Sequence, residues 1–387
     1  MPPQVSARVG IVYDYAAENW PSMDLVGDLL MDGLRRHAPR FAPERIQPRM
    51  PRLLGGWAGG AGYNADRLIG RHVAYPRWLR RHGGGRDLYH VVDHSYAQLV
   101  RALPARRTIV TCHDLDAFRS LLQPERDPRP LWFRAMMKRV LGGLQRAAHV
   151  VCDSEAVRAE LLEHGVVPAD RVSTVPLAAH PDFRADPDPT ADAHVATLLG
   201  PAPPDAVDLL HVGSTAPRKR IGLLLRAAAP MLAANPRARL IRVGGPLEPV
   251  HRQLAEELGI AGRIVEVPWV PRPLLAALYR RAALVVSTSE REGFGLPLVE
   301  AMACGAPVLA SALPVYREVG GGAARYVDGD DPATWSAALS GTLASLADAG
   351  ERSAATAASL DRARRYGLDR FAAGIAAVYD RVLAEAA

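Results

Sequence analysis

The feature that most constrains the fold of this chain is a regular alternation of short apolar runs with amphipathic segments. Strand-like runs separated by helical patterns are typical of parallel sheets covered by helices. The expected strands are residues 8–14, 44–50, 87–93, 107–114, 149–154 and 171–177 in the first half, and 207–213, 238–245, 263–268, 283–289, 306–311 and 324–327 in the second. The pattern therefore predicts an α/β protein.

The rhythm restarts after residues 181–206, a segment rich in Pro, Asp and Ala that is the best linker candidate. A chain of 387 residues is also longer than one ordinary hydrophobic core. We predict two doubly wound, Rossmann-like domains, residues 1–185 and 205–367, facing each other across a cleft with ligands beyond the carboxyl ends of the strands. The last segment, 368–387, is expected to be an amphipathic helix that packs back on one of the halves, the N-terminal one being the candidate.

Composition narrows the class of protein. The net charge is +6, but the basic residues are scattered and do not form a basic helix with interleaved aromatics, which argues against nucleic acid. No signal peptide or membrane-spanning run is recognisable, and Cys112, Cys152 and Cys304 are expected to be buried free thiols, so a cytoplasmic location is predicted. The segment 131–147 mixes apolar and basic residues, typical of a helix covering a sheet, with peripheral membrane contact as the alternative.

The segment 287–311, STSEREGFGLPLVEAMACGAPVLAS, carries the strongest functional signal. A strand is expected to end near Ser289, a helix to start at Pro297, and Gly305 to end that helix. The helix start offers free N–H groups and partial positive charge to a phosphate, and the glycines of the loop allow close approach. Glu292 and Glu300 flank this seat, where carboxylates can hold the hydroxyls of a sugar and the diol of a ribose.

The segment 211–228, HVGSTAPRKRIGLLLRAA, carries a second signal. Arg218 and Lys219 stand at a strand–loop–helix junction, where a planar guanidinium and a compact ammonium suit a diphosphate. The chain has 47 basic residues, and only Lys138 and Lys219 are lysines, which gives Lys219 added weight. Positive charge at a helix start is unfavourable unless an anion neutralises it.

These two segments resemble the retaining GT-B glycosyltransferases of family 4, whose donor site has a carboxylate, seven residues and a second carboxylate, here EGFGLPLVE. The resemblance is strong over 205–330 and weak before it. It implies that Glu300 holds the ribose, Glu292 the transferred sugar, and Arg218 and Lys219 the diphosphate. The further donor-binding residues that it implies are Gly213, Ser214, Trp269, Val270, Gly293, Phe294, Gly295 and Leu296.

In the first half, VTCHDLDAF (110–118) resembles the strand of that family that ends in a histidine beside the reacting sugar, which makes His113 a catalytic candidate. Acceptor-side candidates follow from position at strand ends or in the loop after the first strand, which departs from the glycine-rich loop of the family; they are Asn19, Ser22, Asp93, His94 and Asp114. Ser22 is also expected to cap the first helix. Asp114 and Asp116 form a D-x-D pattern, but the cations assigned to the phosphates make a metal unnecessary.

The resemblance implies transfer, with retention of configuration, of a hexose-type sugar from a UDP- or GDP-linked donor to a hydroxyl of a glycan, a lipid-linked molecule or a small molecule, without a metal or other cofactor. Arg218, Lys219 and the helix start would stabilise the departing diphosphate. Two alternatives remain open on the same frame: a nucleotide-sugar epimerase, and a non-catalytic nucleotide-sugar-binding subunit. A nicotinamide dehydrogenase is disfavoured, because no G-x-G-x-x-G follows a strand.

Overall fold

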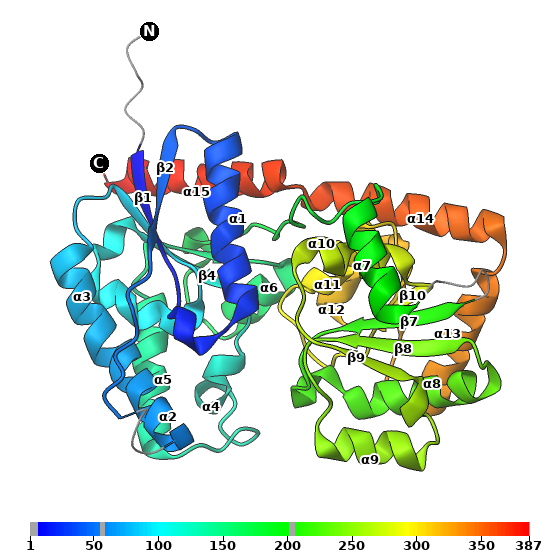
Figure 1. Ribbon diagram of the computed structural model, residues 1–387. Helices are drawn as coiled ribbons and strands as arrows, with labels where there is room; N and C mark the ends of the chain where they lie inside the picture. The colour runs from blue at the N-terminus through cyan, green and yellow to red at the C-terminus, as the bar shows by residue number, and fades with distance from the viewer. Residues whose placement is uncertain (1–6, 55–58, 201–205, 387) are drawn as a thin grey trace, which may run out of the picture. The chain divides into compact units, whose positions relative to one another are not determined.

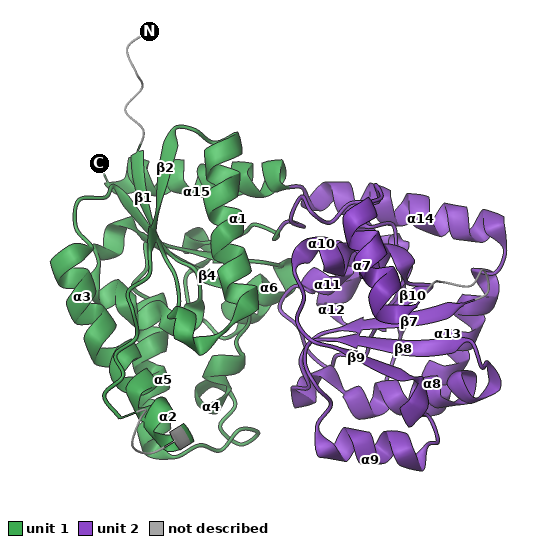
Figure 2. Cartoon of the chain, viewed as in Figure 1, with its two compact units in different colours: residues 1–177, 368–387 green, residues 178–367 purple. Residues whose placement is uncertain are grey.

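The computed structural model describes residues 7–54, 59–200 and 206–386 of the chain. It divides the chain into two compact units, residues 1–177 with 368–387 and residues 178–367 (Figure 2). The first six residues, and residues 201–205 of the expected linker, lie outside the described ranges.

Unit 1 is built on a six-stranded parallel sheet in the order β2-β1-β3-β4-β5-β6. Its strands are β1 (Ala7–Val12), β2 (Phe41–Ile46), β3 (Leu88–Val91), β4 (Thr108–Cys112), β5 (His149–Cys152) and β6 (Val172–Thr174). All six expected strands are present, although β2 begins three residues before the expected 44–50 and ends within it. Polar residues come directly after β4 and β5 and, beyond Val92, after β3, so they gather at the carboxyl edge of this sheet.

Helices and helical turns cover the sheet of unit 1. They are η1 (Ala16–Glu18), α1 (Pro21–His37), α2 (Gly59–Ile69), the π-helical turn η2 (Gly70–Ala74), α3 (Tyr75–His82), η3 (His94–Ala102), η4 (Ala105–Arg107), η5 (Asp116–Phe118), α4 (Arg119–Leu122), α5 (Leu131–Leu144), α6 (Glu155–Glu163), η6 (Ala169–Arg171) and α15 (Leu368–Ala386). The prediction that Ser22 caps α1 is wrong: the helix begins at Pro21, a residue whose fixed φ suits the first turn, and Ser22 lies inside it, exposed.

The last helix belongs to unit 1. α15 packs against α1, and the Arg40 guanidinium lies 2.7 Å from the Asp380 carboxylate. Tyr379, fully buried, places its ring edge-on to Phe41 and its hydroxyl 2.8 Å from Nδ1 of His90 on β3. The chain therefore returns to its first half after completing unit 2.

Unit 2 repeats the architecture with the order β12-β11-β10-β7-β8-β9, again all parallel. Its strands are β7 (Val207–Val212), β8 (Ala238–Val243), β9 (Ile264–Val267), β10 (Leu284–Ser287), β11 (Val308–Ser311) and β12 (Ala324–Val327). Its helices and turns are α7 (Pro189–Leu199), η7 (Pro217–Lys219), α8 (Ile221–Ala234), α9 (Pro249–Glu257), η8 (Ala261–Arg263), α10 (Arg272–Arg281), α11 (Leu296–Ala303), α12 (Pro314–Gly320), η9 (Gly321–Ala323), α13 (Pro332–Ser345), α14 (Ala349–Ala363) and η10 (Arg364–Tyr366).

The helices of unit 2 fall into two groups. α8 packs against α13 and α9, whereas α10 packs against α7 and α11, and Figure 1 shows α8 and α9 on the opposite side of the strands from α7 and α10. Buried Leu, Ile and Ala side chains of α8 pack with those of β7, β8 and α13 in one hydrophobic core. Trp335 of α13 is the largest side chain in this core. Because helices cover both faces of this sheet, a ligand is expected to bind at the carboxyl ends of the strands.

The expectation that residues 181–206 form a linker needs correction. Residues 189–199 form α7, whose start is capped by Asp188 accepting from the Ala191 N–H, and Val195 and Leu199 are buried. Asp192 pairs with Arg280 on α10 at 2.6 Å. The Pro and Asp residues therefore mark a helix start rather than a flexible segment, since Pro suits the first turn and Asp the cap. The structure draws the boundary at Leu177–Ala178.

Candidate functional site

In unit 2, two loops from the carboxyl edge of the sheet are bonded together. One follows β7 and contains η7, and the other follows β10. The Glu290 N–H donates to the carbonyl of Arg218 at 2.7 Å, and the Arg218 guanidinium donates to the carbonyl of Arg291 at 3.2 Å. The segments 211–228 and 287–311 thus meet at one place, although Arg218 and Arg291 are 73 positions apart along the chain.

Glu292 is the centre of this contact. Its carboxylate lies 2.5 Å from the Lys219 ammonium and 2.8 Å from the Arg218 guanidinium. Burial favours a protonated Glu292, but the two cations outweigh it and lower the pKa of Glu292, so the carboxylate is ionised at neutral pH. Lys219 is itself buried at 8% exposure. The anion required to neutralise Arg218 and Lys219 is, in this structure, a side chain of the same unit.

Hydroxyl groups complete the cluster. The Ser289 hydroxyl donates to the Glu292 carboxylate at 2.8 Å, and the Thr288 hydroxyl donates to the carbonyl of Lys219 at 2.9 Å. Thr288 and Ser289 are fully buried at the end of β10. These hydrogen bonds hold the Glu292 carboxylate and the Lys219 backbone in the arrangement seen in this structure.

α11 begins directly after this loop, at Leu296, with Pro297 in its first turn. Gly295 precedes it with φ of +98°, and a Cβ there would lie 2.6 Å from the Tyr316 ring. Only glycine meets both demands without strain. The residue after the helix, Cys304, is its C-cap, and Gly305 follows with φ of +75°, as expected for a helix end.

Glu300 lies one turn inside α11 and is buried. The Tyr279 hydroxyl, from α10, donates to its carboxylate at 2.9 Å. Burial raises the pKa of Glu300 to about 7, while the Tyr279 hydrogen bond and the nearby charge of Arg272 act in the opposite direction. Glu300 therefore differs from Glu292, because it titrates near neutral pH whereas Glu292 stays ionised.

The remaining donor-side candidates take different positions around this cluster. Trp269 is half exposed after β9, with Val270 next to it. Gly213 ends β7 beside Lys219, since a Cβ there would lie 3.4 Å from the Cε of that lysine, and Ser214 is exposed. The Phe294 side chain packs inward against Tyr366, so only its backbone faces the loop.

In unit 1, the carboxyl edge of the sheet gathers three of the predicted side chains around His94. Its Nδ1 accepts from the His113 backbone N–H at 3.3 Å and lies 3.4 Å from the Asp93 carboxylate. Its Nε2 lies 3.6 Å from the Asp114 carboxylate. The predicted residues Asp93, His94, His113 and Asp114 thus form one cluster.

His113 has both ring nitrogens engaged. Nδ1 is bonded to the carboxylate of Asp153, which follows β5, and Nε2 lies 2.9 Å from the carbonyl oxygen of Val92. Burial would lower the pKa of His113, but the carboxylates of Asp153, Asp93 and Asp114 raise it to about 9. The histidine is therefore anchored in the edge of the sheet.

In the loop after β1, Glu18 contacts other elements of unit 1 through its carboxylate. Its carboxylate binds the Arg71 guanidinium and accepts from the Tyr96 hydroxyl at 2.8 Å. The predicted acceptor-side residues of this loop, Asn19 and Ser22, are both exposed, and Asn19 has a left-handed backbone with φ of +52°. Glu18 is therefore buried and held by its partners, whereas Asn19 and Ser22 are exposed to solvent.

Sequence reasoning missed several residues of both clusters. They are Glu18, Arg71, Asp153, Tyr279 and Thr288. One available signal was position: Asp153 follows a strand just as Asp93 and His113 do. Tyr279 had no such signal, because it lies in the middle of a helix that looks like any amphipathic helix.

The two aspartates of the D-x-D pattern make local contacts in this structure. Asp114 accepts from the Asp116 N–H, and Asp116 pairs with Arg119. Across residues 7–54, 59–200 and 206–386, no group of three or more His, Cys, Asp and Glu side chains is arranged to hold a metal ion. Over the same residues, no helix is both long enough and apolar enough to cross a membrane.

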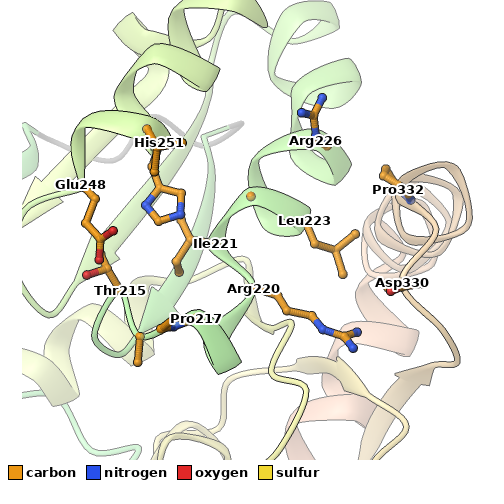
Figure 3. A pocket seen from close by; sticks show the side chains of 13 residues that line it. Thr215, Pro217, Arg220, Ile221, Leu223, Arg226, Glu248, His251, Asp330 and Pro332 are labelled. Carbon is orange, nitrogen blue, oxygen red and sulfur yellow. The ribbon is translucent and has the colours of Figure 1, made fainter. Parts of the chain in front are cut away.

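An open pocket of about 600 Å³ lies in unit 2 (Figure 3). It shares Thr215 and Pro217 with the loop after β7, and its other walls come from the starts of α8, α9 and α13, with His251 and Asp330 on facing sides. Its lining residues do not include Arg218, Lys219 or Glu292. The pocket is therefore lined by other residues than those of the charged cluster.

Two family models match the chain: Glycosyl transferases group 1 over residues 200–339 and Glycosyltransferase Family 4 over residues 34–183. A D-inositol 3-phosphate glycosyltransferase of Thermobispora bispora is 38% identical over 63% of this chain and 59% of the relative, so the chain spans about three fifths of that protein. The O-antigen chain mannosyltransferase B of Escherichia coli is 34% identical over 68% of this chain and 68% of that protein.

Solved structures agree on the fold. Sucrose-phosphate synthase from Thermosynechococcus elongatus has a TM-score of 0.75 at 19% identity, covering 98% of this chain and all of that one. The HepE protein of Anabaena, solved with UDP and glucose, has a TM-score of 0.73 at 17% identity, covering 97% of this chain and all of that one. These similarities support the predicted architecture of two Rossmann-like domains.

Proposed function

This chain belongs to the GT-B glycosyltransferases of family 4, and from that premise we propose that it transfers a hexose-type sugar from a nucleotide-sugar donor to a hydroxyl acceptor. The observation that carries the proposal is the contact of Glu292 with Lys219 and Arg218, at 2.5 and 2.8 Å, beside the start of α11. Two fixed cations and a helix start can hold a diphosphate, and carboxylates can hold sugar hydroxyls.

Binding of the donor would exchange partners within this cluster. Arg218 and Lys219 share the Glu292 carboxylate, so an incoming diphosphate with two negative charges competes with a single carboxylate for both cations. We expect the phosphates to take over the cations and the Glu292 carboxylate to turn to the hydroxyls of the sugar. The Ser289 hydroxyl donates to Glu292 in this structure, and because it can rotate, we expect it to keep donating to the carboxylate in its new position.

The proposed chemistry is metal-independent transfer with retention of configuration. As the bond between sugar and phosphate breaks, negative charge grows on the diphosphate, and Arg218, Lys219 and the N–H groups at the start of α11 stabilise it. The attacking acceptor hydroxyl delivers its proton to the departing phosphate on the same face. The charges needed by the leaving group are thus supplied by side chains and backbone of unit 2, without a metal or another cofactor.

We base the proposed classes of donor and acceptor on the surroundings of Glu300 and Trp269 and on the names of the relatives. We propose that Glu300, which is buried and held by Tyr279, accepts from the ribose diol, and that half-exposed Trp269 contacts the base of a UDP- or GDP-linked sugar. The relatives are named for transfer to D-inositol 3-phosphate and for mannose transfer in an O-antigen chain. We therefore propose a polyhydroxyl acceptor, a glycan, a lipid-linked sugar or a small molecule, and no nucleic acid, in a cytoplasmic setting.

The proposal is tested by pairing donor binding with donor consumption. UDP-, GDP- and ADP-linked hexoses are first screened by thermal shift, since a bound donor raises the unfolding temperature. The stabilising donor is then incubated with and without a panel of hydroxyl acceptors, and products are identified by mass spectrometry and NMR. A glycosylated acceptor supports the proposal, isomerised donor without an acceptor supports an epimerase, and binding without turnover across the panel supports a non-catalytic subunit.

Membrane contact is proposed for the start of α5, and it leads to a prediction. Leu131 and Trp132 are 81% and 62% exposed, and Lys138 and Arg139 lie on the same helix and are both exposed. We expect the protein to float with vesicles that contain phosphatidylglycerol, more weakly with pure phosphatidylcholine and at high salt, because apolar and basic side chains together favour an anionic surface. Trp132→Ala is expected to weaken vesicle binding about tenfold.

Leu198→Ala is the matched control for this experiment, because Leu198 is an exposed apolar residue of a helix in unit 2. It is expected to bind vesicles as the wild type does. Equal binding to charged and neutral vesicles, or equal loss in both variants, would show that α5 is only a helix covering the sheet.

A further inference from the structure

The His113 ring is held from two directions at the carboxyl edge of the sheet of unit 1. Its Nδ1 faces Oδ2 of Asp153, and its Nε2 faces the backbone carbonyl of Val92 at 2.9 Å. The three residues come from the ends of three neighbouring strands, β3, β4 and β5. His113 is buried, with 7% of its surface exposed.

Both partners of the ring can only accept hydrogen bonds when Asp153 is ionised. A backbone carbonyl oxygen has no proton to give, so Nε2 must carry one, and a carboxylate requires one on Nδ1. A ring with protons on both nitrogens is an imidazolium. The geometry therefore assigns the protonation state of His113.

We propose that Asp153 is a positioning residue that holds His113 as a fixed, doubly protonated cation, so that His113 serves the reaction by its charge and not as a proton acceptor. The inference about the reaction rests on the proposed sugar transfer, whereas the assignment of protons does not. The second oxygen of Asp153, Oδ1, is buried and has no hydrogen-bond partner within the described residues, so the carboxylate is directed at the His113 ring.

The neighbouring groups agree with a permanent positive charge. Asp93 follows β3 and Asp114 follows His113 directly, and both raise the pKa of His113 along with Asp153, to about 9 against the effect of burial. Burial alone would raise the pKa of Asp93, but His94 and then His113 lower it to about 2, together with the hydrogen bonds from Ser95. Two further histidines, His94 and His90, lie nearby, and His94 accepts from the backbone N–H of His113 at Nδ1.

A fixed cation changes what His113 does in the proposed reaction. It cannot take the proton of the acceptor hydroxyl, because both nitrogens already hold one. It also cannot donate to a sugar hydroxyl while its two ring N–H groups donate to Asp153 and to the carbonyl of Val92. Its contribution is a positive charge at a strand end, which favours negative charge on a substrate oxygen and persists across the physiological pH range.

The test is Asp153→Asn, which keeps the shape of the side chain and removes its charge. In the wild type, we expect ¹⁵N-resolved NMR to show His113 with both ring nitrogens protonated from pH 6 to pH 8. In Asp153→Asn, the pKa of His113 is expected to fall by about one to three units, because a neighbouring opposite charge accounts for a shift of that size. Asp153→Glu, which restores a carboxylate, is expected to return the doubly protonated ring at least in part.

The matched control is Asp208→Asn in unit 2. Asp208 is an equally buried carboxylate, paired with Arg239 and Arg281, so its loss should destabilise the protein without changing the titration of His113. If the wild type transfers sugar, its kcat is expected to stay flat through pH 6–8, and that of Asp153→Asn to fall as pH rises in this range, with KM for the donor nearly unchanged.

Three outcomes would overturn the inference. They are a neutral His113 ring in the wild type at pH 7, a titration of His113 unchanged in Asp153→Asn, and a loss of kcat in Asp153→Asn that is the same at every pH. The last would mean a structural role only. Absence of any donor turnover in the wild type would instead count against the proposed function, and the NMR titration would still decide the protonation of His113.

Discussion

Replacement of Lys219 by alanine is expected to slow donor turnover by about two to three orders of magnitude, while the protein stays folded. Lys219 supplies one of the two side-chain cations that would face the departing diphosphate, and it is held by the Glu292 carboxylate and by Thr288 at its carbonyl. Loss of one fixed charge at a developing negative charge costs about 2–4 kcal/mol in transition-state free energy. Steady-state donor consumption, with saturating donor, measures this loss directly.

The composition of the chain offers an unusually clean control. Lys138 is the only other lysine, and it belongs to α5 of unit 1, whereas the ion cluster belongs to unit 2. Lys138→Ala is expected to turn over donor at the wild-type rate in a lipid-free assay. Because truncating one partner of a buried ion pair also destabilises a protein, unfolding of Lys219→Ala is measured beside its kinetics. Wild-type turnover in a folded Lys219→Ala variant would remove Lys219 from the mechanism.

The contacts of Glu292 indicate how stable the Lys219→Ala variant will be. Without Lys219, Glu292 keeps Arg218 as a counter-charge at 2.8 Å, so the carboxylate is not left alone in a buried place. We therefore expect a moderate loss of stability and a large loss of rate. The opposite pattern, unfolding at ordinary temperature, would indicate that the cluster is mainly structural.

The sequence predicted the strands well because parallel strands buried on both faces are written as uninterrupted apolar runs, such as RTIVTCHD, which ends just after His113. The family resemblance assigned Arg218, Lys219 and Glu292 to one donor site, and the structure brings these three side chains together at one edge of a sheet. Sequence reasoning failed at 189–199, where Pro and Asp were interpreted as a linker but serve as the cap and first turn of α7.

Partners that depend on packing were beyond reach of the sequence. Asp153 faces His113 only because β5 lies beside β4 in the sheet, and strand order is not contained in an apolar run. Likewise, Tyr279 reaches Glu300 because α10 packs on α11. The sequence therefore indicated which residues carry charge, whereas the protonation of those residues required the neighbours that only the fold supplies.

Glu300 gives the second large prediction, because burial has raised its pKa from an ordinary 4.5 to about 7. A carboxyl group with a raised pKa binds its proton more tightly in the folded than in the unfolded state. The free energy of unfolding therefore decreases as pH rises from about 4.5 to 7, and the full cost is present above pH 7 and absent below 4.5. From the size of the shift, this cost is about 3 kcal/mol.

Glu300→Gln should therefore stabilise unit 2 at pH 8 by about 3 kcal/mol and leave its stability at pH 4.5 nearly unchanged. The Tyr279 hydroxyl can still donate to the amide oxygen of Gln, so the packing is retained. The same change should weaken donor binding about 10- to 100-fold at pH 8, because a charged acceptor for the ribose diol becomes neutral. Denaturant unfolding at the two pH values and donor titration calorimetry measure the two effects.

The pH dependence of donor binding separates this explanation from a general loss of the site. In the wild type, the donor should bind more weakly below pH 7, where Glu300 is protonated, and binding at pH 7 should release a fraction of a proton, visible as a buffer-dependent enthalpy. Glu300→Gln should show neither dependence, and exposed Glu256→Gln on α9 should behave as the wild type. Equal stability of Glu300→Gln and wild type at pH 8 would contradict the assigned burial cost. An unchanged donor affinity would instead show that Glu300 does not hold the ribose.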